Sequence, residues 1–388
     1  MAPGRWRALA LLTLARASIG FQFQSAASVA PFLAREFGLD NTQIGLLVGL
    51  YLLPGIAVAL PGGMLGARFG DRHVVLFGLA LMSAGGAWLA LAGDYASAAV
   101  ARLLSGSGAV LLNVLLTKMV ADWFEERERV LAMSVLVNAW PIGICLALFT
   151  LAPVAEAYSS AMALSTAVLF AAIGLATLFA AYRDPPVIAP VRPGLSLGAI
   201  SAREWWLLLL ASLPWMLFNG AYAVILAFLP LYLLEQGYGI VAAGSVIAVN
   251  TLLVIASVQA GGLWAKHARS PDSVAYIGLT LYAASLAAVL LLPATWLWIA
   301  VAGLVAGLAA GLLVSLPAQV LRADIRAQGM GIFYTVYYAG NALYPPIAGW
   351  LADFSGKASA PIWFAAGSAL ACVPAIRLLR AQTRSRAL

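Results

Sequence analysis

Residues Leu9–Pro31 read LALLTLARASIGFQFQSAASVAP, an apolar run that contains one fixed charge, Arg16. About 20 mostly apolar residues are enough to cross a bilayer as a helix. A guanidinium near the bilayer centre costs about 3 kcal/mol or more, so an arginine in such a run is a candidate functional residue. This stretch therefore predicts a membrane protein and makes Arg16 the first candidate site residue. The alternative is that Arg16 snorkels to the inner surface.

The whole chain has the composition of an integral membrane protein. Its 388 residues are 63% hydrophobic and only 10% charged, with a mean hydropathy of +0.95, whereas soluble domains carry about 25% charged residues. Long apolar runs interrupted by Gly and Pro indicate helices rather than a barrel of alternating strands. The basic residues behind the net charge of +7 lie in short loops, where they orient a protein in the membrane, so we expect no nucleic-acid partner.

Apolar segments of membrane-spanning length form two sets of six. The first set covers 8–34, 43–67, 74–93, 97–121, 130–155 and 160–181, and the second covers 205–234, 240–265, 274–292, 296–320, 329–352 and 361–379. The Pro-rich polar stretch between the sets is typical of a linker. We predict an all-α integral membrane protein with twelve transmembrane helices: a six-helix bundle at 1–181, a cytoplasmic linker at 182–204 and a second six-helix bundle at 205–388.

Loop charges predict the orientation. Arg5 and Arg7 before an apolar run imitate a signal peptide, but the run continues beyond the small residues and contains Arg16, so we expect it to remain as the first helix. If both termini are cytoplasmic, Arg35 and Lys357 are the only basic loop residues outside. By the positive-inside rule, this asymmetry predicts a multi-pass protein of the cell inner (plasma) membrane with both termini in the cytoplasm.

The two sets of helices repeat a residue pattern. Five identities recur at one constant separation, with Pro31, Glu36, Gly38, Gly62 and Gly63 reappearing as Pro230, Glu235, Gly237, Gly261 and Gly262. Duplication of a six-helix unit is a signature of secondary transporters, whose substrate sites lie near the midplane between the repeats.

The loop after the second predicted helix reads GGMLGARFGDR over residues 62–72. It resembles the signature between helices 2 and 3 of the major facilitator superfamily, where the loop forms an inner-face latch. Ala67 stands where the family usually has Asp, so we expect Asp71 to replace part of the latch ion pair. The alternative is an ordinary basic inner loop. The residues that fit the signature are Gly63, Leu65, Arg68, Gly70 and Arg72.

The fourth predicted helix carries a second likeness to this superfamily, an Arg-x-x-x-Gly-x-Gly-Ala signature formed by Arg102, Gly106, Gly108 and Ala109. At 100° per residue, Arg102, Gly106, Ala109 and Asn113 share one face, which puts small residues where helices can pack closely. We expect Arg102 to act in packing or gating rather than in substrate binding. Snorkelling to the headgroups is the alternative.

The inner loop DWFEERER at 122–129 looks like the loop after helix 4 in the cyanate and nitrate/nitrite porter branches. A Trp-Phe pair followed by mixed charges also occurs as a plain interfacial anchor. The nitrate porters' anion-binding arginines on helices 2 and 8 have no counterpart in this sequence. The resemblance therefore favours the cyanate-like branch and disfavours nitrate itself. It implies two bundles that rock about a central site.

Polar side chains inside the predicted helices supply further candidates. Tyr334, Tyr338 and Asn341 share one face of the helix at 329–352, and such groups cannot face lipid cheaply. Helix-to-helix hydrogen bonding is the alternative and contributes only about 0.6 kcal/mol on average. We expect Arg16 to supply a countercharge, with Tyr334, Tyr338, Asn341, Asn138 and Asn250 as candidate contacts.

Several functions are disfavoured. All fifteen acidic residues lie in loops or at helix ends, which disfavours a buried carboxylate for proton coupling or for recognising cations. The two cysteines and two histidines are too scattered for a metal site, and no catalytic set is present, so we expect no enzyme activity, cofactor or metal.

The sequence thus predicts a secondary active transporter that moves a small inorganic or organic anion by alternating access. One alternative is a multidrug-type exporter of hydrophobic or cationic compounds. A large aromatic cavity with a carboxylate would support it, and the sequence offers the aromatic residues but not the carboxylate. Another is a non-transporting membrane sensor, which would need an appended domain. We expect the solute and the lipid bilayer to be the partners of a monomer.

Overall fold

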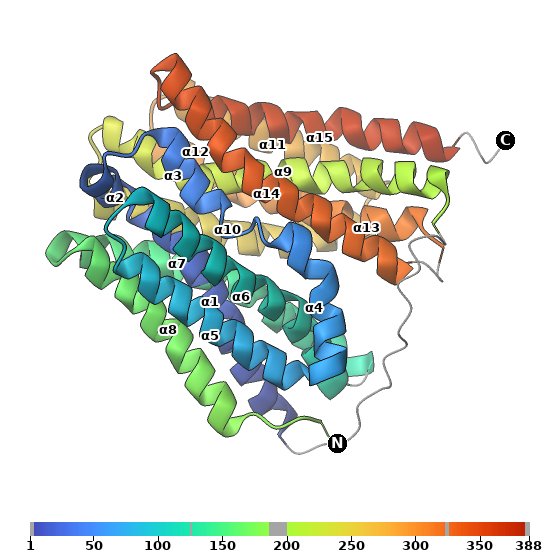
Figure 1. Ribbon diagram of the computed structural model, residues 1–388. Helices are drawn as coiled ribbons and strands as arrows, with labels where there is room; N and C mark the ends of the chain where they lie inside the picture. The colour runs from blue at the N-terminus through green and yellow to red at the C-terminus, as the bar shows by residue number, and fades with distance from the viewer. Residues whose placement is uncertain (1–3, 125, 186–199, 323–325, 385–388) are drawn as a thin grey trace. The chain divides into compact units, whose positions relative to one another are not determined.

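The computed structural model describes residues 4–124, 126–185, 200–322 and 326–384, and all regular structure in these ranges is helical (Figure 1). The chain divides into two compact units. One consists of Met1–Leu39 and Leu46–Gly194, and the other of Asp40–Gly45 and Leu195–Leu388. A short segment from the first half of the chain, residues 40–45, therefore belongs to the second unit.

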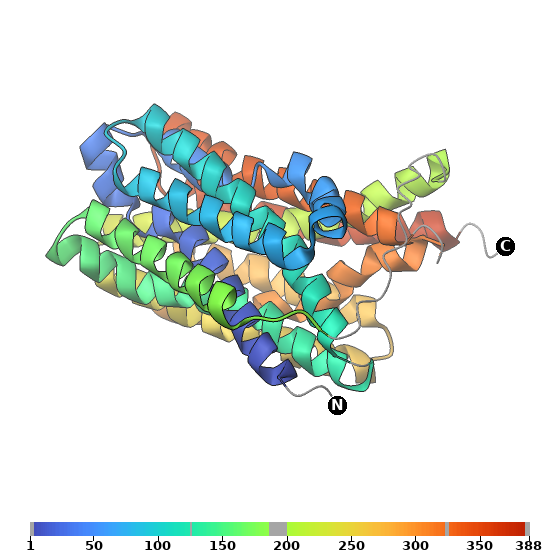
Figure 2. The same cartoon turned by 60° about the horizontal axis from the view of Figure 1, so that its bottom comes forward.

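The first unit is built from helices that pack side by side, as Figures 1 and 2 show for α5 and α6. Its helices are α1 (Arg5–Ser28), α2 (Ala30–Phe37), most of α3 (Asn41–Gly49, whose start belongs to the second unit), α4 (Gly55–Phe69), α5 (Asp71–Ala90), α6 (Tyr95–Trp123), α7 (Glu126–Ala157) and α8 (Ser160–Ala181).

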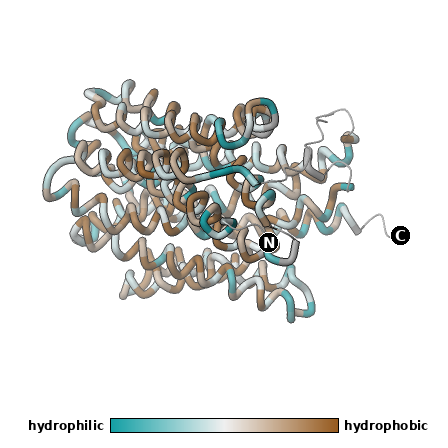
Figure 3. Tube along the Cα trace, turned by 90° about the horizontal axis from the view of Figure 1, so that it is seen from below, coloured by the Kyte–Doolittle hydropathy of each residue, from teal (hydrophilic) through white to brown (hydrophobic). Residues whose placement is uncertain are grey.

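In the second unit, α9 packs against α14 and α15. The helices are α9 (Ala202–Glu235), α10 (Ile240–His267), α11 (Pro271–Leu291), α12 (Thr295–Ala306), the short 3₁₀ helix η2 (Gly307–Ala309), α13 (Ala310–Val320), α14 (Arg326–Ser355) and α15 (Ala360–Arg384). Figure 3 shows hydrophobic residues along the lengths of the helices and hydrophilic residues concentrated at their ends and in the loops. This distribution suits helices that are surrounded by lipid.

Nine helices among the described residues are long and apolar enough to cross a membrane: α5, α6, α7, α8, α9, α10, α11, the α12–α13 pair and α15. The predicted spans at 8–34, 43–67 and 329–352 are not among them. The first and third carry the polar residues that make them site candidates, and the second is split into short helices. The count of twelve spans and the cytoplasmic termini stay predictions.

Two predicted helices are wrong as continuous segments. The segment at 8–34 breaks at Val29 into α1 and α2, because Pro31 has no N–H to continue the helix and takes a place in the first turn of α2. The segment at 43–67 is interrupted by turns between Leu50 and Pro54, which separate α3 from α4. A proline lies at each break, Pro31 at the start of α2 and Pro54 before α4.

The predicted helix at 296–320 contains one turn of 3₁₀ helix at Gly307. The α10 side chain of Ser257 supports this turn, because its Oγ accepts a 2.9 Å hydrogen bond from Gly307 N and donates to the Gly303 carbonyl. A neighbouring helix thus satisfies a backbone group that the irregular turn displaces, as an apolar environment requires.

The loop predicted at 122–129 and the end of the predicted linker differ from the prediction. The expected loop at 122–129 is mostly helix, since α6 ends at Trp123 and α7 begins at Glu126. Within the predicted linker at 182–204, residues 186–199 lie outside the described residues. At its end, a capping box between Ser201 and Glu204 starts α9 three residues earlier than the predicted Trp205.

Close backbone contacts hold α1 against α7. A Cβ atom at Gly20 would lie 2.2 Å from the Trp140 carbonyl oxygen, and one at Gly143 would lie 2.0 Å from the Ala17 carbonyl oxygen. Only glycine fits at these points. The two helices therefore pack through small residues, which is how membrane helices come into close contact.

Asp353, near the end of α14, binds the start of α3. Its carboxylate accepts hydrogen bonds from the backbone N–H groups of Asn41 (3.1 Å) and Thr42 (2.8 Å), and also from both side chains. The first N–H groups of a helix lack partners within the helix and attract anions. This contact explains why residues 40–45 belong to the second unit.

Candidate functional site

Arg16 lies on α1 and contacts α6. Its Nη1 donates a 3.3 Å hydrogen bond to Thr117 Oγ1, and the Thr117 hydroxyl donates to the Asn113 carbonyl. One turn earlier on the same face of α1, Thr13 has a buried hydroxyl oxygen without a hydrogen-bond partner among the described residues. The half-buried Arg16 thus lies in a polar region of the first unit. Asn138 lies half-buried on α7, which packs against α1.

Arg102 on α6 is fully buried and does not snorkel. Its Nε donates to the Leu47 carbonyl at 2.8 Å, and its two terminal nitrogens donate to the carbonyls of Gln22 (2.9 Å) and Phe23 (3.1 Å). The guanidinium carbon also lies 4.5 Å from the centre of the Tyr51 ring. These contacts tie α1 and α3 to α6, so the guanidinium has a packing role in the first unit.

The small residues after Arg102 also pack closely. A Cβ atom at Gly106 would lie 2.1 Å from the Tyr51 carbonyl oxygen, and one at Gly108 would lie 2.2 Å from the Gly78 carbonyl oxygen on α5. The signature on α6 therefore brings this helix into backbone contact with α5 and with the turn after α3.

The signature at 62–72 carries an ion pair that involves Asp71. Gly70 has a φ of 85°, which suits glycine and allows the sharp turn between α4 and α5. Asp71 begins α5 and pairs with Lys118 of α6, which also lies 3.2 Å from Asp122. We expected Asp71 to replace part of a latch pair, but Lys118 was not recognised as its partner. The i, i+4 spacing of Lys118 and Asp122 was the signal in the sequence.

The other signature residues lie around this turn. Arg72 donates a 2.9 Å hydrogen bond from Nη2 to the Phe179 carbonyl of α8. Arg68 is exposed, with its guanidinium carbon 5.2 Å from the centre of the Phe69 ring, and Gly63 lies within α4. The signature thus connects the α4–α5 turn to α6 and α8 inside the first unit.

The second unit contains an aromatic cluster that α9 and α14 build together. Trp215 stacks on Phe333 with ring centres 6.2 Å apart and on Tyr337 at 6.3 Å, at angles of 26° and 29°. We call the whole group the aromatic cluster; its members are Trp215, Phe218, Phe333, Tyr334, Tyr337 and Tyr338. The sequence pointed to the tyrosines but not to Trp215 and Phe218, whose i, i+3 spacing was the available signal.

The predicted polar contacts of the second unit occupy different environments. Tyr334 is 39% exposed, whereas Tyr338 is buried. Asn341 is also buried and donates to the Tyr337 carbonyl of its own helix at 3.0 Å. Asn250 lies apart from this face on α10, where its Nδ2 donates to the Ile299 carbonyl of α12 at 2.7 Å, and its buried Oδ1 has no hydrogen-bond partner among the described residues.

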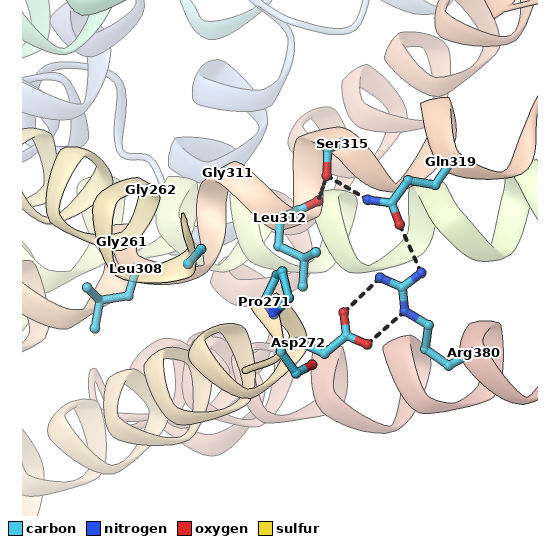
Figure 4. Close-up of a pocket in the computed structure, with 12 residues that line it drawn as sticks. Gly261, Gly262, Pro271, Asp272, Leu308, Gly311, Leu312, Ser315, Gln319 and Arg380 are labelled. Atoms are coloured by element: carbon cyan, nitrogen blue, oxygen red, sulfur yellow. Dashed lines mark hydrogen bonds and ion pairs between the residues drawn. The ribbon is translucent and has the colours of Figure 1, made fainter. Parts of the chain in front are cut away.

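A cavity of about 560 Å³ opens in the second unit between α10, α11, α13 and α15 (Figure 4). Arg380 forms a two-pronged ion pair with Asp272 and donates to Gln319 Oε1 at 2.9 Å, and Gln319 binds Ser315. The charge of Arg380 is therefore balanced by a carboxylate 2.7 Å away. No group of metal-ligating side chains occurs in the described part of the chain.

Solved structures of membrane transporters share the fold of this chain. A bacterial homologue of the human lysosomal transporter Spinster matches with a TM-score of 0.78 at 16% identity, covering 98% of this chain and 96% of that one. A D-xylose–proton symporter matches with a TM-score of 0.77 at 15% identity, covering 94% and 95%. Identities this low establish the fold alone.

Residues 12–322 match the model of the Major Facilitator Superfamily, so the chain belongs to this family. Similar proteins include a 3-(3-hydroxy-phenyl)propionate transporter of Escherichia coli, 35% identical over 133 residues (33% of this chain, 32% of the relative). A hexuronate transporter of Bacillus subtilis is 22% identical over 255 residues (63% and 60%), and a probable L-galactonate transporter of E. coli is 28% identical over 198 residues (50% and 44%).

The alignments cover from about a third to three-fifths of the length of these relatives. The relatives are transporters and not enzymes. The family resemblance that the sequence predicted is confirmed at the level of the superfamily, whereas the cyanate-like branch stays a prediction.

Proposed function

We propose that the protein is a secondary active transporter of a small organic anion, which it moves across the inner membrane as a monomer by alternating access of its two bundles. The observation that carries the proposal is the position of Arg16. Its half-buried guanidinium contacts the Thr117 hydroxyl of α6, and all fifteen acidic residues of the sequence lie in loops or at the ends of the predicted helices. An anion is the natural partner of such a group.

The names of the relatives support a carboxylate in particular. Hexuronate, L-galactonate and 3-(3-hydroxy-phenyl)propionate differ in their bodies, but each carries one carboxylate. Guanidinium binds carboxylate through two parallel N–H···O hydrogen bonds, which gives both affinity and orientation. A carboxylate is therefore a better candidate than cyanate, although both are small anions.

A thermal-shift experiment on the purified protein tests this proposal. Glucuronate, galactonate, benzoate, cyanate and a lipophilic cation are added separately, because a ligand that binds only the folded protein raises its melting temperature. A ligand at 100 times its dissociation constant adds about 2.7 kcal/mol to the unfolding free energy, so binding is easily detected. We expect at least one carboxylate to raise the melting temperature and the cation to have no effect.

Variants of Arg16 locate the binding site. Arg16→Lys keeps the charge but loses the fork of donors, so we expect weakened binding, and Arg16→Gln should abolish it. Arg377→Gln on α15 serves as a matched control, because this arginine contacts the ring of Tyr276 rather than the candidate region. A response to the cation alone would favour the multidrug-type exporter, and unchanged carboxylate binding by Arg16→Gln would remove Arg16 from the site.

A further inference from the structure

The cavity of the second unit is polar at one end and apolar at the other (Figure 4). Asp272, Gln319 and Arg380 lie together at the polar end. Leu308 and Gly261 lie at the opposite end. From Leu308 to Gln319 the helix rises about 16 Å at 1.5 Å per residue. This lining suits an elongated molecule that has one polar and one apolar end.

The predicted spans place the polar end of the cavity at a membrane surface. Ala265 and Gln319 both line the cavity, and they lie at the ends of the spans predicted at 240–265 and 296–320. With the predicted orientation, this surface is the cytoplasmic one, and the apolar end of the cavity reaches into the hydrocarbon region. A molecule that is polar at the surface and apolar below it is a membrane lipid.

Arg380 has hydrogen-bond donors to spare at the polar end. Its Nε and Nη2 donate to the Asp272 carboxylate, and its Nη1 donates to Gln319 Oε1. A guanidinium has five N–H groups, so two of them remain for an acceptor in the cavity. Phosphate oxygens match the planar fork of a guanidinium.

Two further cations flank the cavity. Lys266 directly follows Ala265, and Arg269 directly precedes Ser270; Ala265 and Ser270 both line the cavity. Lys266 and Arg269 are exposed and form no ion pair within the described part of the chain. Since Arg380 is already balanced by a carboxylate, these two residues give the polar end a net positive charge. Basic pockets between membrane helices on the cytoplasmic side bind anionic lipid head groups.

Glycines keep space open toward the apolar end. Gly262 and Gly311 line the cavity, and a Cβ atom added at either position would meet open space. At Gly261, by contrast, a Cβ atom would lie 2.5 Å from Leu308. The wall is therefore closed at Gly261 and open at the other two glycines. The volume of about 560 Å³ is typical of a ligand site.

We propose that this cavity binds an anionic phospholipid, with the phosphate at Arg380, close to Lys266 and Arg269, and an acyl chain along Gly262 and Gly311. The occupant is a lipid and not the transported solute, so the inference goes beyond the proposed function and does not depend on Arg16. A zwitterionic lipid would leave the two flanking cations without a countercharge. A phosphate compound without chains would leave the apolar end empty.

The choice of lipid tests the head group and the chain. Delipidated protein in a neutral detergent is titrated with phosphatidylglycerol, phosphatidylcholine or glycerol 3-phosphate, and bound molecules are counted by native mass spectrometry. We expect phosphatidylglycerol to fill one saturable site and to raise the melting temperature. The other two compounds should bind at least tenfold more weakly, because one lacks the net charge and the other lacks the chains.

A double variant, Lys266→Gln with Arg269→Gln, removes both flanking cations. Each basic residue near a membrane surface contributes about 1 kcal/mol to the attraction of anionic lipids, so the double variant should bind phosphatidylglycerol about 30-fold more weakly. The matched control is Arg7→Gln with Arg35→Gln, which removes two exposed cations of the first unit and should bind as the wild type does.

Gly311→Leu fills the cavity without disturbing the helix. Leucine is a better helix former than glycine, so the variant should be at least as stable as the wild type in the absence of lipid, yet lose phosphatidylglycerol binding. Gly262→Leu is a second filling variant with the same expected result. Gly367→Leu on α15 is the matched control, because Gly367 also has open space around it but does not line the cavity.

Each outcome decides the inference. Wild-type binding of phosphatidylglycerol by both filling variants would exclude the cavity as the site. Equally tight binding of phosphatidylcholine would refute an anionic head group, and equally tight binding of glycerol 3-phosphate would show a site for free anions. If no lipid binds, the inference is overturned, whereas the carboxylate experiments on Arg16 still decide the proposed function separately.

Discussion

Replacing Arg102 by methionine should destabilise the first unit, because this buried guanidinium supplies hydrogen bonds that no other group can. Leu47 lies in the last turn of α3, which ends at Gly49, so its carbonyl has no donor within the helix. Arg102 Nε donates the missing hydrogen bond to the Leu47 carbonyl oxygen at 2.8 Å. Methionine has a similar length but cannot donate.

The magnitude follows from the contacts that are lost. A buried acceptor left without its donor costs about 1–3 kcal/mol, and the loss of a desolvated guanidinium over the Tyr51 ring costs about 2 kcal/mol. Removing a buried charge offsets part of this loss. We therefore expect Arg102→Met to lower the unfolding free energy by about 3 kcal/mol.

Unfolding in mixed micelles, followed by far-UV circular dichroism, measures this change. Arg102→Lys should not restore stability, because an ammonium cannot reach three carbonyls on two helices as the planar guanidinium does. Arg377→Met is the control and should change the free energy by less than about 0.5 kcal/mol, as surface substitutions usually do. Wild-type stability in Arg102→Met would refute the packing role.

Three further substitutions test other contacts. Gly20→Val should lower the unfolding free energy by about 3 kcal/mol or prevent folding, because the added Cβ would lie 2.2 Å from the Trp140 carbonyl oxygen. Gly367→Val is the control, because Gly367 has open space around it, and the unfolding free energies of the two variants are compared. Lys118→Met should lower stability by about 1–3 kcal/mol by leaving two carboxylates without their cation, and Lys118→Arg should restore most of it; equal stability of both variants would argue against the pair. Asp353→Asn should cost about 1 kcal/mol and speed hydrogen exchange at the start of α3, since a neutral amide binds a helix N-terminus less well; unchanged exchange there would show that the carboxylate is not needed.

The helices were largely predictable because each one is formed by a single continuous segment of the sequence, so its apolar length can be read directly. The length of the apolar runs predicted helices through most of the described residues, and the signature at 62–72 led to the family. The errors occurred where proline interrupts an apolar run, as at Pro31 and Pro54, since hydropathy alone does not register a missing N–H group.

The candidate site was less predictable because its partners come from distant parts of the chain. Arg16 stood out as a charge in an apolar helix, but its contact with Thr117 depends on how α1 meets α6. Helical periodicity grouped Tyr334 with Tyr338, yet one is partly exposed and the other buried. Trp215 joined the tyrosines only through the packing of α9 on α14. Pairings between helices are not encoded in the spacing of residues within one helix.

The most direct test of the central proposal is uptake into proteoliposomes. Purified protein is reconstituted into vesicles that are preloaded with one of several unlabelled carboxylates, and entry of the same carboxylate, radiolabelled, from outside is followed over time. The account predicts saturable uptake of at least one carboxylate, reduced in Arg16→Lys, absent in Arg16→Gln and unchanged in Arg377→Gln. Wild-type uptake by Arg16→Gln, or uptake of lipophilic cations in place of carboxylates, would contradict it.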